Sequence, residues 1–358
     1  MEIYWLWLSH LKGIGPVTSR KLVNGLGSPR AVYQATSENL LSIQGLRSGL
    51  IETLLSQRSL DTAKGVQEHM RRCQIDLLTY DDPYFPSYIN RFSSLPAVLY
   101  YRGNLRAPTF CIGIVGSRRC TSYGKEVAAE AAAFLGQAGI TVVSGMAKGI
   151  DSYAHTACLK AGGYTLAFVA NGVDICYPPE HQTLMEEIIE NGAVFSSYPP
   201  GTRPRHEYFP YRNKLLAAWV DKLLVVEAAG RSGALITAKY AMEYKRKVLA
   251  VPNSIYSPES AGSNRLLFSG AEVYMEPQQL IDNDGIEVLP RITKKQEKLH
   301  CTINPQEQAI LDRLDQPQAV QNLLGICNGD MSVLLELLCQ MELEGKVVVS
   351  GQNVKGVR

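Results

Sequence analysis

The sequence lacks several features that mark membrane, secreted and metal-binding proteins. It has no run of 18 or more apolar residues, so we expect no membrane partner. Its eight cysteines are scattered without a Cys-x-x-Cys pair, which argues against a zinc site and favours reduced thiols in the cytoplasm. The apolar segment Met1 to His10 has no basic start and no small-residue cleavage site, and we interpret it as mature sequence.

The sequence also lacks the signatures of common nucleotide enzymes. The absence of a Gly-x-x-x-x-Gly-Lys-Ser/Thr loop disfavours P-loop ATP hydrolysis. The absence of a Gly-x-Gly-x-x-Gly turn with a following acid counts against a dehydrogenase. No nucleophile and base stand out together, so we predict no catalytic residues, and the scattered cysteines predict no metal site. The net charge is only +2, so any polyanion must be recognised by a local patch.

A chain of 358 residues is long enough for two or three domains. Helical periodicities broken by glycine turns predict a small all-α domain at the start, and strand and helix patterns alternate in the middle. The predicted organisation is a helical domain over 1–60, a connecting segment over 61–107, a Rossmann-like domain over 108–281, a linker over 282–304 and a winged-helix-like domain over 305–358.

The middle region has the rhythm of βαβ units. Short apolar runs recur with helical stretches between them, which is typical of a parallel sheet covered by helices. The predicted strands are Phe110 to Val115, Ile140 to Val143, Thr165 to Val169, Ala193 to Ser196, Leu223 to Val226 and Val248 to Val251. The fold class is therefore α/β, an extended Rossmann-like fold with a parallel or mixed sheet.

The residues that follow these strands are small or cationic. Ligands bind beyond the carboxyl ends of the strands in an open parallel sheet, where glycine lets the backbone approach an anion and helix N-termini offer free amides. Arginine adds bidentate donors for phosphate. The candidate phosphate-binding residues are Gly116, Ser117, Arg118, Arg119, Ser144, Gly145, Lys148, Asn171, Arg212, Asn213, Lys214 and Arg231.

Each of these turns also has a simpler explanation. A single Gly-Ser turn before a helix is more often plain helix capping, and only the set together indicates an anion site. His155 is read as a packing or helix-surface histidine, and Asp151 as the N-cap of the helix Ser152 to Ala161. Asp174 and Glu227 fit a role in fixing loops equally well. Tyr123, Tyr153 or Phe209 could stack on bases, although packing is the more common role of each.

The two ends of the chain leave alternatives open. Residues 305–358 predict three helices and a β-ribbon, as in a winged helix, but the expected recognition helix Met331 to Leu343 contains no Lys or Arg. A helical dimerisation or capping module is the alternative. The turn Gly13-Ile14-Gly15 resembles half of a helix-hairpin-helix, whose amides can hold a DNA phosphate, and a structural turn explains it equally well.

The ordered motifs resemble the DNA-processing protein A family (DprA, also called Smf). The resemblance covers about Tyr80 to Ile281. It rests on Gly116-Ser117-Arg118, Ser144 to Asp151 with Ala154-His155, Tyr177-Pro178, Phe209-Pro210-x-Arg212-Asn213, Ser232 to Ala238 and Gly262-x-Asn264-Arg265. The sequence departs from the family at Ser197, where Glu is usual, and at Asn253, where Gly is usual. Asn tolerates positive φ and could keep the backbone shape of that glycine.

The resemblance implies a function as well as a fold. It implies a non-enzymatic protein that binds and protects single-stranded DNA, loads the RecA recombinase onto it during natural transformation, and forms a homodimer through the Rossmann domain without a cofactor. It places the DNA pocket at Gly116 to Arg118, Gly145, Lys148 and Asn171, with Arg212 and Asn213 nearby. The competing predictions are a phosphoribohydrolase-like enzyme acting on a nucleoside monophosphate, whose Pro-Gly-Gly-x-Gly-Thr-x-x-Glu stretch is missing, and a winged-helix DNA-binding regulator.

Overall fold

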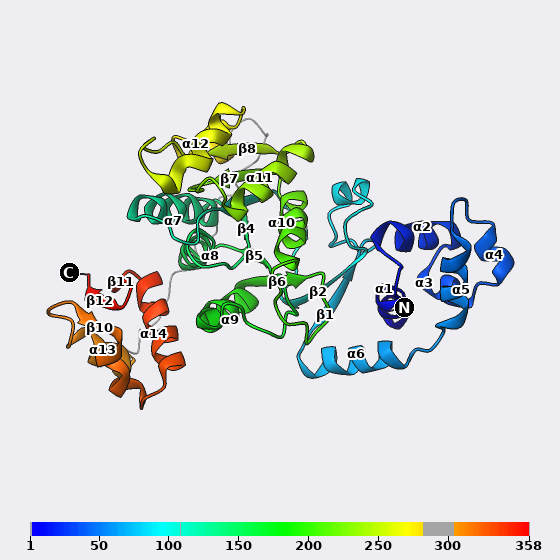
Figure 1. Cartoon of the computed structure of the whole chain (residues 1–358), viewed down its shortest axis with the longest axis horizontal. Helices are drawn as coiled ribbons and strands as arrows, with labels where there is room; N and C mark the ends of the chain where they lie inside the picture. The colour runs from blue at the N-terminus through cyan, green and yellow to red at the C-terminus, as the bar shows by residue number, and fades with distance from the viewer. Residues whose placement is uncertain (1, 108, 282–303, 358) are drawn as a thin grey trace.

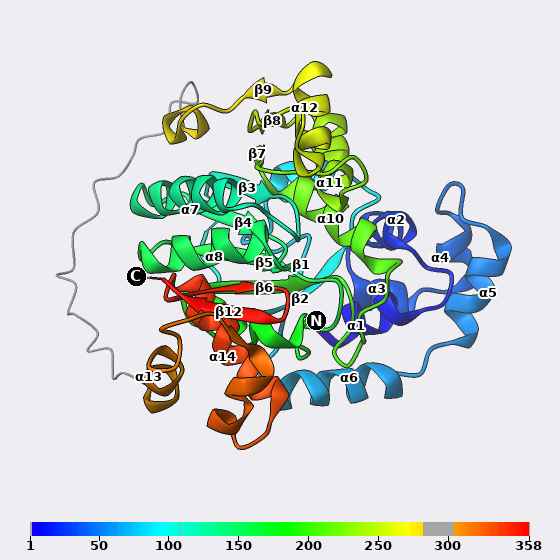
Figure 2. The same cartoon turned by 60° about the vertical axis from the view of Figure 1, so that its left-hand side comes forward.

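A computed structural model of the chain describes residues 2–107, 109–281 and 304–357. Three parts follow one another along the molecule: helices at the N-terminal end, a central sheet covered by helices, and a small group of helices and strands at the C-terminal end (Figure 1). Figure 2 shows that the C-terminal part lies against the central one rather than apart from it.

The N-terminal part is all α-helical up to residue 72. Its helices are α1 (Glu2–His10), α2 (Pro16–Leu26), α3 (Pro29–Gln34), α4 (Ser37–Leu41), α5 (Ser48–Ser56) and α6 (Asp61–Arg72). Prolines at the first turn start α2 and α3, where a missing N–H costs nothing, and Thr36 closes a capping box on α4. Trp5, Leu6 and Leu8 of α1 are buried and bring these helices together over α6.

The central sheet has nine strands among the described residues, in the order β1-β2-β6-β5-β4-β3-β7-β8-β9. The strands are β1 (Asp76–Thr79), β2 (Val98–Gly103), β3 (Cys111–Val115), β4 (Thr141–Ser144), β5 (Thr165–Phe168), β6 (Gly192–Ser196), β7 (Lys222–Val225), β8 (Lys247–Ala250) and β9 (Glu272–Val273). Strands β3 to β9 pair in parallel, whereas β2 pairs antiparallel with β6 and with β1. The sheet is therefore mixed, and all six predicted strands are confirmed.

Helices cover both faces of this sheet. They are α7 (Ser122–Gln137), α8 (Ile150–Lys160), α9 (Gln182–Asn191), α10 (Tyr208–Trp219), α11 (Gly233–Glu243) and α12 (Ala261–Phe268), with short 3₁₀ turns η1 (Ser87–Arg91), η2 (Pro179–His181), η3 (Pro258–Ser260) and η4 (Pro277–Leu280). Ile112 and Ile114 of β3 pack against α7 and α8 on one face, while Phe168 packs toward α10 on the other. Alternate residues of the buried strands thus serve the two layers.

The C-terminal part consists of α13 (Pro305–Leu311), β10 (Gln318–Ala319), η5 (Val320–Cys327), α14 (Met331–Leu343), β11 (Val347–Ser350) and β12 (Asn353–Gly356). Its three-stranded sheet has the order β10-β12-β11 and is antiparallel. Three helical segments and a β-ribbon are present as expected, with 3₁₀ geometry in the middle segment. Membership of the winged-helix class stays a prediction.

Helix α14 packs against the central part. Lys125 Nζ of α7 lies 3.1 Å from Glu342 Oε1, and Thr183 Oγ1 of α9 donates a hydrogen bond of 2.9 Å to Glu336. Lys160 Nζ of α8 donates to the carbonyl of Leu343. The helix that a winged-helix reader would present to DNA is thus held by three helices of the core.

The boundaries predicted from sequence remain our proposal for the domain organisation. The segment 61–107 contributes α6, β1, η1 and β2, so two of the nine strands come from it. The predicted linker 282–304 lies outside the described residues except for Asn304. Among described residues, no single helix is long and apolar enough to cross a membrane, although the bent pair Val320–Cys327 and Met331–Leu343 meets that test by length and composition.

Candidate nucleic-acid interface

Most of the predicted site residues meet at one edge of the sheet. An open groove and an adjoining smaller pocket lie beyond the carboxyl ends of β3, β4, β5 and β7. Ten of the twelve candidate residues lie in these two hollows or in the turns that line them: Gly116, Ser117, Arg118, Arg119, Gly145, Lys148, Asn171, Arg212, Asn213 and Arg231. The expectation that strand ends gather these side chains at one edge holds for these ten.

Ser144 and Lys214 lie elsewhere. Ser144 is fully buried, and its hydroxyl donates a hydrogen bond of 2.6 Å to the carbonyl of Ile114 between the neighbouring strands. Lys214 Nζ donates to the Ser94 hydroxyl at 2.9 Å. The hydroxyl of Ser144 is therefore occupied by a contact within the sheet and is not available to a ligand. Neither Ser144 nor Lys214 lines the pocket or the groove.

The loop after β3 presents two arginines. Arg118 and Arg119 are exposed, while Ser117 is buried and its hydroxyl accepts from the Arg119 N–H at 3.1 Å, which fixes the turn. At Gly116 a Cβ would come within 2.5 Å of Ile150 Cγ1, so only glycine fits the crossing of this loop with α8. Thr121 then caps α7 through the Gly124 N–H.

The loop after β4 presents Lys148. Its side chain is more than half exposed and forms an ion pair with Glu180 of η2. Burial raises the pKa of Glu180, but the hydrogen bond and charge of Lys148, together with a backbone hydrogen bond and the nearby His181, outweigh it and lower that pKa. A phosphate binding to Lys148 would therefore compete with the carboxylate of Glu180.

The prediction that Asp151 caps the next helix is wrong. Helix α8 begins at Ile150, and its N-cap is Gly149, whose φ of 79° suits glycine alone. Asp151 lies inside the first turn, and its Oδ2 accepts from the N–H groups of Gly145 at 3.2 Å and Ala147 at 3.4 Å. Burial raises its pKa, while Arg212 and these N–H groups oppose the rise. Asp151 therefore fixes the β4 loop from beneath.

Arg212 is a buried arginine of α10 that ties strand ends together. Its Nη1 donates to the carbonyl of Gly145 and, at 2.7 Å, to that of Phe168. Burial lowers its pKa to about 10, with Asp151 acting in the opposite direction, so it stays a cation at neutral pH. Its Nε has no hydrogen-bond partner among the described residues. The positive charge lies under the pocket and contributes to its field more than to direct contact.

The two asparagines are partly occupied by loop contacts. Asn171 is buried, and its amide donates to the carbonyls of Gly172 and Ile175 at 2.9 and 2.7 Å, which closes the loop after β5. Asn213 donates to the carbonyl of Gly233 at 3.2 Å and so joins α10 to the start of α11. Both side chains still border the hollows and shape their walls.

Aromatic rings line the join between the pocket and the groove. Phe209 belongs to both hollows, and its ring lies 6.0 Å from that of Tyr177. The Arg118 guanidinium lies 5.3 Å from the centre of the Phe209 ring. Of the three aromatics considered from sequence, Phe209 is in the groove. Tyr153 instead packs beneath Lys125, and Tyr123 donates from its hydroxyl to the carbonyl of Pro252.

Sequence reasoning missed two cationic or titratable residues of the groove. Arg205 and His206 are both exposed and line it just before α10 begins at Tyr208. Their signal was the run Arg203-Pro204-Arg205-His206, a short basic cluster between β6 and the motif Phe209 to Asn213. A short basic loop between two strand-end motifs could have identified both residues as candidates, but it was not considered.

Three other predictions have structural outcomes. His155 is fully buried with Nδ1 2.7 Å from Thr165 Oγ1, and burial lowers its pKa to about 3, so it is a neutral packing histidine. Glu227 accepts from the N–H of Thr121 at 2.9 Å and fixes a loop. Asn253 does not adopt the positive φ that asparagine tolerates, and its side chain donates to Glu227 at 3.3 Å.

The fold and the edge geometry define a class. A mixed Rossmann-like sheet with exposed arginines and a lysine at its strand ends places the chain among the Rossmann-like α/β proteins, whose ligands bind at that edge. Residues 76–284 match the family DNA recombination-mediator protein A. The chain belongs to that family.

Similar proteins agree with this assignment. Protein Smf of Synechocystis sp. is 36% identical over 303 residues, which cover 83% of this chain and 75% of that protein. A putative DNA processing protein DprA of Mycobacterium tuberculosis is 39% identical over 245 residues, which cover 64% of this chain and 63% of that protein.

Solved structures show the same fold. DNA processing protein A from Streptococcus pneumoniae superposes with a TM-score of 0.67 at 30% identity, covering 80% of this chain and 98% of that one. A structure of DNA processing protein A from Helicobacter pylori, described for its single-stranded DNA binding mode, has a TM-score of 0.52 at 29% identity and covers 58% of this chain and 94% of that one.

Proposed function

We propose that this protein binds single-stranded DNA in the groove and pocket at the strand ends. The observation that carries the proposal is the set of exposed cations around an aromatic centre. Arg118, Arg119, Lys148 and Arg231 come from the loops after three different strands, and Phe209 lies between them. Cations in separate loops can follow successive phosphates, while a ring offers a surface on which a base stacks whatever its identity.

The shape of the site favours a single strand over a duplex. The pocket bordered by Gly145, Asn171 and Phe209 lies within the sheet edge, where an unpaired base or a phosphate could enter and a duplex could not. The likeness to the Helicobacter pylori protein, described for its single-stranded DNA binding mode, supports the same ligand class. Affinity at such a site should fall with salt and depend little on sequence.

A salt titration of binding tests this proposal. The full chain is titrated with an unstructured oligonucleotide and with a duplex of the same sequence, between low and physiological salt. We expect tighter binding to the single strand and a log–log salt slope of about −0.7 for each phosphate neutralised, hence about −2 to −3 for three or four contacts. Preference for the duplex, or a slope near zero, would contradict the proposal.

We further propose that the protein protects single-stranded DNA in the cytoplasm and loads the RecA recombinase onto it, as its family membership suggests. A binder of the sugar-phosphate backbone can cover DNA of any sequence, which this task demands. The test is assembly of RecA on DNA already coated with a single-strand binding protein. An unchanged assembly rate in the presence of this protein would contradict the loading step while leaving DNA binding intact.

A homodimer through the Rossmann-like part is the third element of the proposal. Phe268 of α12 is 94% exposed, and Met275 just after β9 is 73% exposed. Among the described residues, β9 is the last strand of the sheet, and its outer edge pairs with no other described strand. Sedimentation of the full chain should show a dimer, and Phe268→Glu should shift it toward the monomer. A monomeric parent protein would contradict this element alone.

The winged-helix regulator is the weaker candidate. The helix it would use, α14, has no Lys or Arg and contacts α7, α8 and α9 through its carboxylates and its C-terminal carbonyl. The phosphoribohydrolase alternative gains no support from the site, where Asp151 is buried beneath the loop and Glu227 is committed to Thr121. Release of free base from AMP by the purified protein would revive it.

A further inference from the structure

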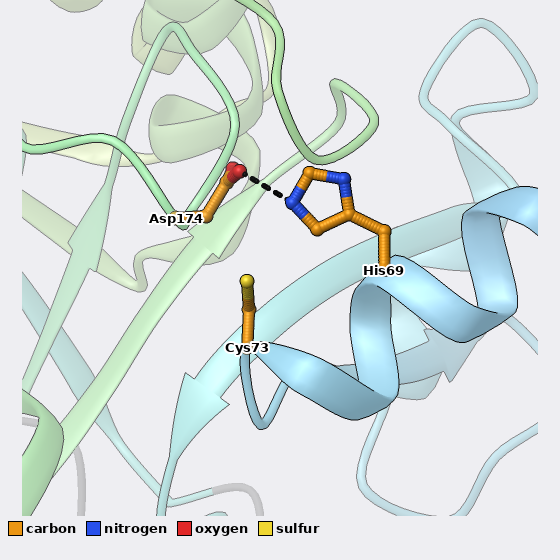
Figure 3. Close-up of side chains that lie close together, drawn as sticks. All are labelled: His69, Cys73 and Asp174. Carbon is orange, nitrogen blue, oxygen red and sulfur yellow. Dashed lines mark ion pairs between the residues drawn. The ribbon is translucent and has the colours of Figure 1, made fainter.

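Three side chains of different metal-binding types meet outside the DNA groove. His69 and Cys73 stand one helical turn apart at the end of α6, and Asp174 comes from the loop after β5. Figure 3 shows the three side chains directed toward one another across the space between helix and loop. Their ligand atoms all lie within 4.8 Å of one another. The cluster joins residues that are about a hundred positions apart in the sequence.

The donor set suits a zinc-class divalent ion. Zinc takes imidazole nitrogen, thiolate sulfur and carboxylate oxygen, with bonds of about 2.0 to 2.3 Å. A tetrahedral ion with such bonds places its ligand atoms about 3.3 to 3.6 Å apart. His69 Nε2 lies 3.1 Å from Asp174 Oδ2, close to that spacing. The Cys73 sulfur lies within 4.8 Å of the other two ligand atoms, so its distance to each exceeds the tetrahedral spacing by at most about 1.5 Å.

The surroundings hold two of the three ligands in place. The Cys73 N–H donates to the carbonyl of His69 at 3.1 Å, which fixes the two residues on one face of the helix end. Both oxygens of Asp174 lie within hydrogen-bond distance of the Gly201 N–H, at 2.9 and 2.8 Å, which orients the carboxylate. A ligating carboxylate that is itself hydrogen-bonded is typical of metal centres.

The solvent side of the cluster is open. The His69 side chain is 37% exposed, against 11% for Asp174. A Cβ at Gly201 would lie 3.6 Å from His69 Cε1, so the absence of a side chain at this position leaves room beside the ring. Three protein ligands and a water molecule would complete four-coordinate geometry.

We propose that His69, Cys73 and Asp174 bind one zinc-class divalent ion that fastens α6 to the loop after β5. Asn171 and Tyr177, three residues to either side of Asp174, both line the DNA pocket. The ion therefore ties a helix of the N-terminal region to a loop that borders the DNA pocket. An ion that binds only the folded chain also raises its stability by mass action.

The test uses the full chain, freed of any affinity tag and kept reduced, with Co²⁺ and Zn²⁺ as probes. We expect one Co²⁺ per chain with a thiolate-to-cobalt charge-transfer band, displaced by Zn²⁺, and a rise in melting temperature with Zn²⁺. Cys73→Ser should abolish the charge-transfer band. His69→Ala and Asp174→Asn should each weaken Zn²⁺ binding at least tenfold, and Asn keeps an oxygen acceptor for the Gly201 N–H.

Matched controls separate this cluster from other thiols and imidazoles. Cys120→Ser removes another free, partly buried thiol, and His206→Ala removes an exposed histidine. Both should keep stoichiometric binding and the charge-transfer band. Failure of the parent chain to bind either ion, or retention of the band in Cys73→Ser, overturns the proposal. Metal stoichiometry, the charge-transfer band and the melting temperature are all measured without DNA. Their outcome is therefore independent of the proposed DNA-binding function.

Discussion

The strand-end groove and helix α14 are two surfaces on which DNA binding was predicted, and they differ in charge and in accessibility. The groove presents Arg118, Arg119 and Arg231 in exposed loops. Helix α14 contains no Lys or Arg, and Glu336 and Glu342 are engaged by residues of the core. We therefore expect a polyanion to gain free energy at the first surface and none at the second.

The difference between the groove and α14 shows which kind of surface can bind an extended chain of phosphates. Loops after parallel strands converge at one edge, so cations distant in sequence act together there. A helix presents a surface of its own residues only, and α14 directs part of that surface to α9 and η2. The C-terminal part is placed to support the core, while the core holds the candidate site.

The largest expected effect is on the groove. Replacing Arg118 and Lys148 together with alanine removes two charge-assisted contacts worth about 1.5 to 3 kcal/mol each, so single-strand affinity should fall at least about 100-fold. Fluorescence anisotropy at fixed salt measures it. Lys239→Ala, which removes a cation 76% exposed on α11, is the matched control and should keep the parent affinity. Equal affinity of the double variant and the parent would place the site elsewhere.

The next effect separates buried from exposed arginines of the same edge. Arg212→Ala should lower the free energy of unfolding by about 3 to 5 kcal/mol, because buried Asp151 loses its cationic neighbour. Arg231→Ala, at an exposed position, should change it by no more than about 0.5 kcal/mol. Urea unfolding followed by circular dichroism measures both. If the two variants lost similar amounts of unfolding free energy, Arg212 would not have the structural role proposed for it.

A smaller effect is expected at the contact between α14 and the core. Lys125→Ala removes the ion pair with Glu342, whose side chains are 30% and 22% exposed, and should lower unfolding free energy by about 1 kcal/mol or less. The loss should shrink in high salt, because partly exposed pairs are screened. A Lys125 variant with no change at low salt would indicate that this contact does not hold α14.

The smallest effect is expected when the C-terminal part, which contains α14, is removed. A chain ending at Ile281 should bind single-stranded DNA within about threefold of the full chain, a difference below about 0.7 kcal/mol. Circular dichroism and a cooperative unfolding transition show that the shortened chain is folded. Loss of binding by a folded, shortened chain would reverse the comparison and assign DNA binding to the C-terminal part.

Much of this architecture could be predicted because it depends on patterns within short stretches of sequence. The six core strands are short apolar runs separated by helical stretches, and each is found within a residue or two of its predicted bounds. The glycines after the strands were predicted to let the backbone approach an anion, whereas the structure shows that Gly116 leaves room for Ile150 of α8 and that Gly149, at a φ of 79°, leaves room for the Ser117 carbonyl. The weakly helical middle segment of the C-terminal part was recognised as helical, although its 3₁₀ geometry was not.

Side-chain direction could not be predicted in the same way. Asp151 and Arg212 both belong to motifs of the candidate site, yet both are buried and hold loops from below. A motif records which residue types occur in order, whereas burial depends on elements distant in sequence. For the same reason the missing Cys-x-x-Cys pair excluded only a metal site built from neighbouring residues, and not one built from His69, Cys73 and Asp174.

The sequence by itself determined the α/β class, the strand ends and the gathering of small and cationic residues after them, because hydrophobic periodicity and glycine turns are local properties. Only the tertiary structure decided which of those residues are open to a ligand. It buried Arg212, directed Lys214 to Ser94, added Arg205 to the groove and brought Asp174 to α6. These outcomes depend on packing between segments far apart in the chain, which no local pattern specifies.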